Sequence, residues 1–481
     1  MKPPFNLPAF EFAPIFPYIA LAVTGMLGLV LHMVKPKGTS NSLFGWTLAG
    51  VFVALLSQIG LIGNEYMELE MVFKDKSGIL AETLILLSTF VVVLISNPYF
   101  KRTRIHCPEF YPLICWASLG GMIMCTSSNL LAIFVGLELL SISLYVLAGM
   151  NKRSKFSQEA ALKYFLLGAF ATGFFLYGIA FHYGASGTLN LDGFSFFKSQ
   201  ANAPYQSLDV FAFVLILVGF SFKCGIAPFH QWIPDVYSGA PTNIVAFMAT
   251  GAKVGPFIAL YHLIAQSAPL QHVAFPACVA LSVLSMVVGN AMAFTQSETK
   301  KLLAYSSVAN AGYIMAFLAA LSAARSAANW TLLYFLIGYV FATLGVFIIL
   351  ALAEGDQEGP QTIDSLRGLS KRHPMLAALL VVFVLSQIGI GPVAGFVGKV
   401  LIVSDLVRLD QAWLAIVLVA NSAFGAFYYF KLVRSAYSEE GETSTGYELS
   451  SGAISALAIC ALVVVGSVIF YAPLVSQLGQ R

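Results

Sequence analysis

Charged side chains are scarce in this sequence. Lys, Arg, Asp and Glu together make up 10% of the 481 residues, whereas a soluble globular chain averages about 25%. So few charges cannot cover a surface that faces water. Apolar residues make up 58% of the chain, and the mean hydropathy is +0.81. Because they fall in long runs rather than short clusters, we expect the chain to lie mostly in lipid.

The sequence also lacks the patterns that metal, cofactor and nucleic-acid sites need. Its six cysteines never form a CxxC pair and mostly lie in apolar runs, so we expect no iron–sulfur, zinc or other metal site. No phosphate-binding loop is present, and we expect no flavin or haem in this chain. A net charge of +3 without any block of five basic residues argues against a nucleic-acid partner.

Long apolar runs dominate what is present. A helix needs about 20 apolar residues to cross a bilayer, and the sequence contains 14 such runs. We therefore predict an all-α membrane protein with 14 transmembrane helices and no soluble domain. The runs begin near Phe16, Phe44, Gly78, Phe110, Asn129, Glu159, Val210, Pro241, Val273, Lys301, Thr331, Pro374, Ala412 and Ser450.

Basic residues in the connections predict the orientation, because they favour the cytoplasmic side. Connections after odd-numbered helices hold 15 Lys and Arg, and the other connections with the two termini hold 7. Both termini are therefore predicted to face the periplasm. The remaining basic residues lie inside the apolar runs: Lys163, Lys223, Lys253 and Lys399.

Charges inside the membrane are the first candidates for function. Placing one at the bilayer centre costs about 2.5–3.5 kcal/mol on insertion scales, so a chain rarely keeps several without a use. Glu138 lies in the middle of LLAIFVGLELLSISLYVLAGM, too far from either end to reach the headgroups. It is either an acid that carries a proton or a protonated acid that only ties helices together.

Three of the lysines lie close to a proline that predicts a break in the helix. The pairs are Lys223 with Pro228, Lys253 with Pro256, and Lys399 with Pro392. Proline removes the helix bond to the carbonyl four residues back. Broken backbone at membrane depth is tolerated only against protein or water, so the breaks predict a hydrated path. The alternative, kinks that only aid packing, explains one such break better than three.

Lysine suits proton transfer because its surroundings can switch it between charged and neutral, whereas arginine stays charged. Lys163, about one turn inside its helix, is either a member of a relay or an anchor at the headgroups. His230, in PFHQWIPDVYSGAP, either passes protons toward the cytoplasm or serves capping and packing. Glu82 lies near its helix start, and we expect it to reach the headgroups.

Three segments are distinctive together: FKxxxxPFHQWxPDVYxGAP, AFMATGAK and KKLLAYSSVANAGY. They resemble the antiporter-like, proton-translocating subunits of bacterial NADH-quinone oxidoreductase, respiratory complex I, and the likeness covers nearly the whole chain. The resemblance implies two inverted repeats of five helices, helices 4–8 and 9–13, in which helices 7 and 12 are broken. On this chain the repeats would cover about residues 109–265 and 272–437, between a three-helix segment, 1–108, and a last helix, 449–478.

The resemblance also implies roles for the buried charges. Glu138 and Lys223 resemble the glutamate–lysine pair of the first half-channel, and Lys253 resembles the central lysine. Lys399 resembles the exit-side lysine, and a lysine there is typical of the subunit N branch rather than of subunit M. Asn310 departs from that branch, which often has histidine at this place, so a relay at Asn310 would have to use water.

A membrane subunit that pumps protons, driven by quinone chemistry elsewhere in its complex, is therefore expected. Flavin, iron–sulfur clusters and quinone would belong to other subunits. The neighbours implied are subunits M, K and J together with lipid, in the bacterial inner membrane. The alternative is an Mrp-type sodium/proton antiporter subunit without a redox partner.

Overall fold

The computed structural model describes residues 12–34, 40–62, 74–196, 206–324, 329–354, 361–439 and 449–469. Within these ranges the chain is helical, and the only β-type pairings are two isolated bridges. The longer helices are α1 (Phe16–Val34), α2 (Ser40–Ile59), α3 (Lys76–Arg102), α4 (Phe110–Thr126), α5 (Leu130–Ala148), α6 (Lys155–Ser186), α8 (Gln206–Cys224), α11 (Gly251–Gln266), α12 (Gln271–Thr295), α13 (Thr299–Ala324), α14 (Asn329–Ala353), α16 (Pro374–Ile388), α17 (Ala394–Arg408), α18 (Ala412–Tyr437) and α19 (Ser451–Ile469). Shorter ones are α7 (Gly193–Phe196), α9 (Trp232–Gly239), α10 (Thr242–Ala249) and α15 (Leu369–Arg372).

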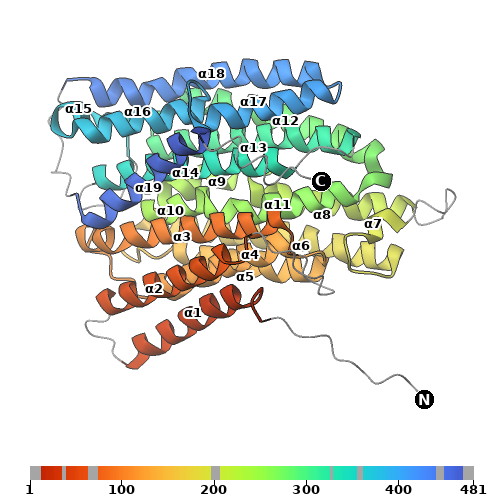
Figure 1. Ribbon diagram of the computed structural model, residues 1–481, viewed down its shortest axis with the longest axis horizontal. Helices are drawn as coiled ribbons and strands as arrows, with labels where there is room; N and C mark the ends of the chain where they lie inside the picture. The colour runs from red at the N-terminus through yellow and green to blue at the C-terminus, as the bar shows by residue number, and fades with distance from the viewer. Residues whose placement is uncertain are drawn as a thin grey trace.

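The helices lie side by side along the long axis of the molecule (Figure 1). The α1 and α2 helices form one edge, α16, α17 and α18 form the opposite edge, and α19 crosses α14 and α3 between them. The α11, α13 and α14 helices are almost completely buried, whereas α1, α6, α18 and α19 are largely exposed. The exposed faces are apolar; on α6 they carry Leu162, Phe165, Leu166 and Phe170. Such faces suit lipid or other membrane subunits rather than water.

The predicted all-α membrane fold is confirmed. Among the described residues, 12 helical spans are long and apolar enough to cross a membrane, and α4 and α16 are shorter apolar helices. Together these begin within a few residues of the predicted starts. The exact number of membrane crossings stays a prediction, as do the repeat boundaries. The ends of the first and last predicted segments, including both termini, lie outside the described residues.

Local signals explain where several helices start. Asn129 begins α5 by accepting the N–H groups of Leu131 and Ala132, and Asp75 begins α3 by accepting that of Gly78 at 2.6 Å. These side chains satisfy N–H groups that the first turn of a helix leaves without partners. The six cysteines are all buried with free thiols, in keeping with their apolar surroundings in the sequence.

Candidate functional site

The α8 helix ends at Cys224 in a glycine cap. Gly225 has a φ of +76°, a left-handed conformation that costs glycine little. Its N–H donates to the carbonyl of Phe222 at 3.1 Å. The next N–H, that of Ile226, donates to the carbonyl of Ser221 at 2.8 Å. This Schellman motif ends the helix before α9 begins, so the predicted break in the seventh membrane helix is present.

The α16 helix ends in the same way. Gly389 has a φ of +82°, and its N–H donates to the carbonyl of Ser386 at 3.2 Å. The N–H of Ile390 donates to the carbonyl of Leu385 at 3.0 Å. The chain then enters α17, so the predicted twelfth helix is also broken.

The prolines act differently from what the sequence suggested. Pro228 and Pro392 lie in the segments between the half-helices, where a left-handed glycine has already ended the helix. The expectation that Pro228 opens a bond within a helix is therefore wrong. Pro256 does lie inside α11, but the interruption between α10 and α11 falls earlier, at Thr250, with φ −126° and ψ −95°.

Lys399, on α17, lies against the end of α16. Its ammonium donates to the carbonyls of Gln387 at 2.9 Å and Ile388 at 2.8 Å. A third bond, at 2.8 Å, goes to the hydroxyl of Ser422. Three acceptors match the three N–H groups of an ammonium, and the C-terminal end of a helix dipole favours a cation. A Cβ at Gly389 would come within 2.7 Å of the lysine Cδ, so glycine also provides room for this side chain.

Lys253, on α11, lies against the end of α8. Its ammonium donates to the hydroxyl of Ser307 on α13 and is almost fully buried. A Cβ built on Gly225 would lie 3.4 Å from this ammonium. Each half-helix that ends in a Schellman motif therefore has a buried lysine from another helix beside its last turn.

Lys223, in the last turn of α8, lies within reach of the charge of Glu138 on α5 and lines a small cavity. The ammonium donates to the hydroxyl of Ser141 at 2.8 Å and to that of Tyr164 at 3.0 Å. The carboxylate of Glu138 accepts a bond from the Thr172 hydroxyl at 2.8 Å. Ser141, Thr172 and Lys223 line a cavity of about 10 Å³, which is room for roughly one water molecule. The two charges are thus neighbours without a direct ion pair.

A chain of polar groups leads from Lys253 to Lys399. Ser307, which binds Lys253, is preceded along α13 by Ser306, whose hydroxyl is hydrogen-bonded to the Tyr429 hydroxyl. Tyr429 donates to the side-chain oxygen of Gln387 at 3.2 Å. The backbone carbonyl of Gln387 accepts the bond from Lys399. All of these residues are buried, so the chain crosses the interior of the molecule.

Comparison with known proteins agrees with this geometry. Residues 127–425 match the family described as "NADH:quinone oxidoreductase/Mrp antiporter, TM". A protein named NADH-quinone oxidoreductase subunit N from Trichlorobacter lovleyi is 38% identical over 437 residues, covering 89% of this chain and 88% of that protein. One of the same name from Salinibacter ruber is 37% identical and covers 86% and 83%. The chain belongs to the NADH-quinone oxidoreductase subunit N family. The predicted resemblance is therefore confirmed.

Solved structures show the same fold. A chain of respiratory complex I from Thermus thermophilus with bound aureothin superposes with a TM-score of 0.80 and 33% identity, covering 95% of this chain and 97% of that one. A chain of the Mrp complex from Dietzia sp. superposes with a TM-score of 0.83 but only 18% identity, covering 98% and 97%. The second match shows a shared fold alone, so the Mrp-type alternative has less support than subunit N.

The remaining candidate residues, Lys163, His230 and Asn310, have different surroundings from those of the buried lysines. Lys163 forms ion pairs with Glu159 and Asp235, both at 2.7 Å, and its side chain is 42% exposed, so it lies apart from the buried lysines. His230 lies in the segment between α8 and α9 and is partly buried. Asn310 is buried on α13, where its amide donates to a backbone carbonyl one turn back, beside the polar chain.

Sequence reasoning missed the hydroxyl groups that contact the lysines. Ser141 and Tyr164 bind Lys223, and the Ser306–Ser307 pair with Tyr429 continues the path from α11. Hydroxyl side chains cost little inside a membrane helix because they can bond to the helix's own backbone. Their presence in a run is therefore a weak signal. The one hint was that four of the five lie beside residues already singled out: Ser141 in the run around Glu138, Tyr164 next to Lys163, and Ser306 and Ser307 in KKLLAYSSVANAGY.

The expectation for Glu82 is wrong. Its side chain does not reach the surface: it is 0% exposed, and one oxygen lies 3.1 Å from the Lys74 ammonium. The carboxylate also accepts bonds from the Gln58 amide, at 2.6 Å, and from the Tyr18 hydroxyl. Lys74 precedes α3 and is itself buried. Its ammonium therefore neutralises the Glu82 carboxylate inside the protein. The place of Glu82 near the start of its helix had suggested a position at the headgroups.

Proposed function

We propose that this chain translocates protons as a membrane subunit of an NADH:quinone oxidoreductase and carries out no redox chemistry itself. The observation that carries the proposal is the series of buried polar groups that lies between Lys253 and Lys399. Buried lysines are costly in a membrane protein, and a lysine can hold or release a proton. Hydroxyls can accept one hydrogen bond while donating another, so they can connect such sites.

The three lysines suit different steps. Lys399 has three acceptors around it, which favours the charged ammonium. Lys223 faces two hydroxyls, and a hydroxyl can accept a bond from an ammonium or donate one to a neutral amine. Both protonation states of Lys223 are therefore accommodated, and the nearby carboxylate of Glu138 supplies the opposite charge. We therefore assign Lys223 the role of gaining and losing a proton in each cycle, and Lys399 the role of retaining one.

The setting of the chain follows from its relatives. We infer that it lies in the membrane arm of a complex I in a bacterial inner membrane, beside subunit M and the small subunits K and J. Flavin, iron–sulfur clusters and quinone would then be bound by other subunits. We also infer that both termini face the periplasm, where a cytoplasm-dependent reporter fused after Arg481 should be inactive. An active reporter there would reverse the orientation.

Substitution of the central lysine tests the function. Lys253→Met should lower both proton pumping and the coupled rate of quinone reduction in vesicles that hold the assembled complex, because the buried proton site is lost. Lys371→Gln, at an exposed position, is the matched control and should leave both unchanged. Normal pumping by Lys253→Met would remove the basis of the proposal. Recovery of the chain without any NADH-oxidising partner would favour the antiporter alternative.

A further inference from the structure

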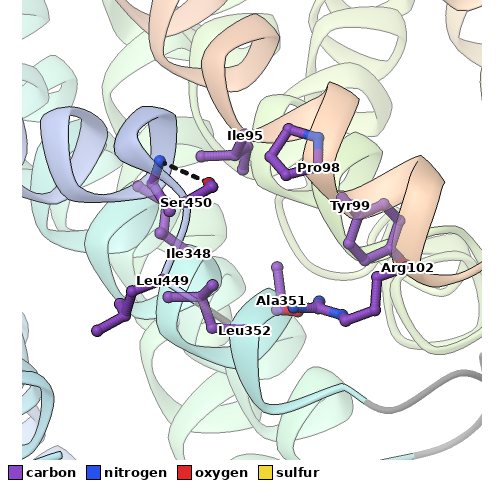
Figure 2. Close-up of a pocket in the computed structure, with 10 residues that line it drawn as sticks. Ile95, Pro98, Tyr99, Arg102, Ile348, Ala351, Leu352, Leu449 and Ser450 are labelled. Atoms are coloured by element: carbon purple, nitrogen blue, oxygen red, sulfur yellow. Dashed lines mark hydrogen bonds between the residues drawn. The ribbon is translucent and has the colours of Figure 1, made fainter. Parts of the chain in front are cut away.

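A cavity of about 180 Å³ lies away from the lysine path, where three helix ends meet. It is bounded by the last turns of α3 and α14 and by the first turn of α19 (Figure 2). The basic residues of the connections predict that all three ends lie on the cytoplasmic side. The cavity is partly open to the outside of the protein, so a molecule at the membrane surface can reach it.

One wall of the cavity is cationic. Arg102 and Tyr99 of α3 face the cavity opposite Ser450, next to the first turn of α19 (Figure 2). The Arg102 guanidinium donates one bond to the carbonyl of Ala351, but its Nε–H is buried and finds no hydrogen-bond acceptor among the described residues. A buried donor without an acceptor is rare and points to a missing ligand. The start of a helix, here α19, is a second source of positive potential.

The other walls are apolar. Ile95 from α3, Ile348 and Leu352 from α14, and Leu449 before α19 line the cavity. A free phosphate ion would make no favourable contact with these apolar side chains. An amphipathic anion would contact the cationic wall with its charged group and the apolar walls with its hydrocarbon part. Exposed Ile454 continues the apolar surface outward along α19.

The surrounding charges agree with an anionic ligand. Lys101 and Arg104 lie next to Arg102 in the sequence and are exposed, and basic clusters on the cytoplasmic side attract anionic lipid. Among the described residues, the acid Glu354 accepts a bond from the cavity-lining Tyr99 hydroxyl at 3.0 Å and lies 3.7 Å from the Lys300 ammonium. Its charge is therefore already balanced.

We propose that this cavity binds an anionic phospholipid. The phosphate would accept the Arg102 Nε–H, and an acyl chain would lie along the apolar wall between α3 and α19. A bound lipid would thereby join α19, which is largely exposed, to the buried α3 and α14 helices.

Photo-crosslinking tests the proposal on the assembled complex, purified by a tag on this chain and placed in phosphatidylcholine vesicles. A photoactivatable phosphatidylglycerol should label peptides of α3, α14 and α19 more than a photoactivatable phosphatidylcholine does. Arg102→Gln should reduce the phosphatidylglycerol labelling by about tenfold or more, since a charged hydrogen bond is lost. Lys371→Gln, at an exposed position that does not line the cavity, should leave the labelling unchanged.

A second variant tests the proposal even if the complex with Arg102→Gln fails to assemble. Ala453→Leu narrows the cavity from α19 without changing any charge and should reduce labelling by both lipids. Equal labelling by the two lipids, or unchanged labelling in Arg102→Gln and Ala453→Leu, would overturn the proposal. Loss of phosphatidylglycerol labelling on adding inorganic phosphate would also overturn it, because a free anion would then be the ligand.

Discussion

Tyr429→Phe is the sharpest test of the polar chain. The change removes one oxygen, which is hydrogen-bonded to the Ser306 hydroxyl and to the Gln387 side chain. Among the contacts described above, that oxygen alone connects Ser306 of α13 with Gln387 at the end of α16. If protons pass along this link, pumping and coupled quinone reduction should fall by about tenfold, equivalent to about 1.4 kcal/mol on the rate-limiting barrier.

The adjacent residue provides a matched control. Tyr428 is also buried on α18, and its hydroxyl donates to the side chain of Asn290 at 3.0 Å, so it does not link the serines of α13 to Gln387. Each substitution removes hydrogen bonds worth about 0.5–1.5 kcal/mol apiece, so both variants should be slightly less stable. Only Tyr429→Phe should pump poorly.

Proton uptake or release per quinone reduced, measured in sealed vesicles with a pH-sensitive dye, separates the two variants. Thermal unfolding of the purified complex gives the stability loss of each. Normal pumping by Tyr429→Phe would refute the path through Tyr429. An equal loss of pumping in Tyr428→Phe would show that the effect comes from packing, not from proton transfer.

Three further predictions concern the Glu138–Lys223 pair, the Lys74–Glu82 ion pair and the cofactor content of the chain. Glu138→Gln and Lys223→Met should each reduce pumping, and the double variant should be little worse than the worse single one, because both remove one coupled unit; losses that multiply would mean that the residues act independently. Lys74→Met should destabilise the chain by about 3–5 kcal/mol, since it leaves the Glu82 carboxylate buried without its cation. Adding Glu82→Gln should restore part of the thermal stability. An unchanged unfolding temperature in Lys74→Met would contradict this prediction. The isolated chain should contain no flavin, haem or iron–sulfur cluster, and stoichiometric iron or a visible absorption band would disprove that.

The positions of the buried lysines were predictable because of what a charge costs in lipid. Lys223, Lys253 and Lys399 stand out in otherwise apolar runs, and the structure buries all three. The same reasoning left the role of Lys163 open, since distance from a helix end does not say which face a side chain takes. Its neighbour Tyr164 faces inward to Lys223, whereas Lys163 lies at the surface.

Composition and the spacing of apolar runs by themselves determined that this is an all-helical membrane protein, approximately where its helices begin, and which charges need an explanation. Pro228 and Pro392 also marked the segments in which two helices are broken, although glycines end those helices. Only the tertiary structure decided what each charge contacts. Ser307, Tyr429 and Gln387 come from three different helices, and their alignment into one path depends on packing between segments distant in the sequence. Hydrogen bonds are short and directional, so no pattern along one helix can specify such a path.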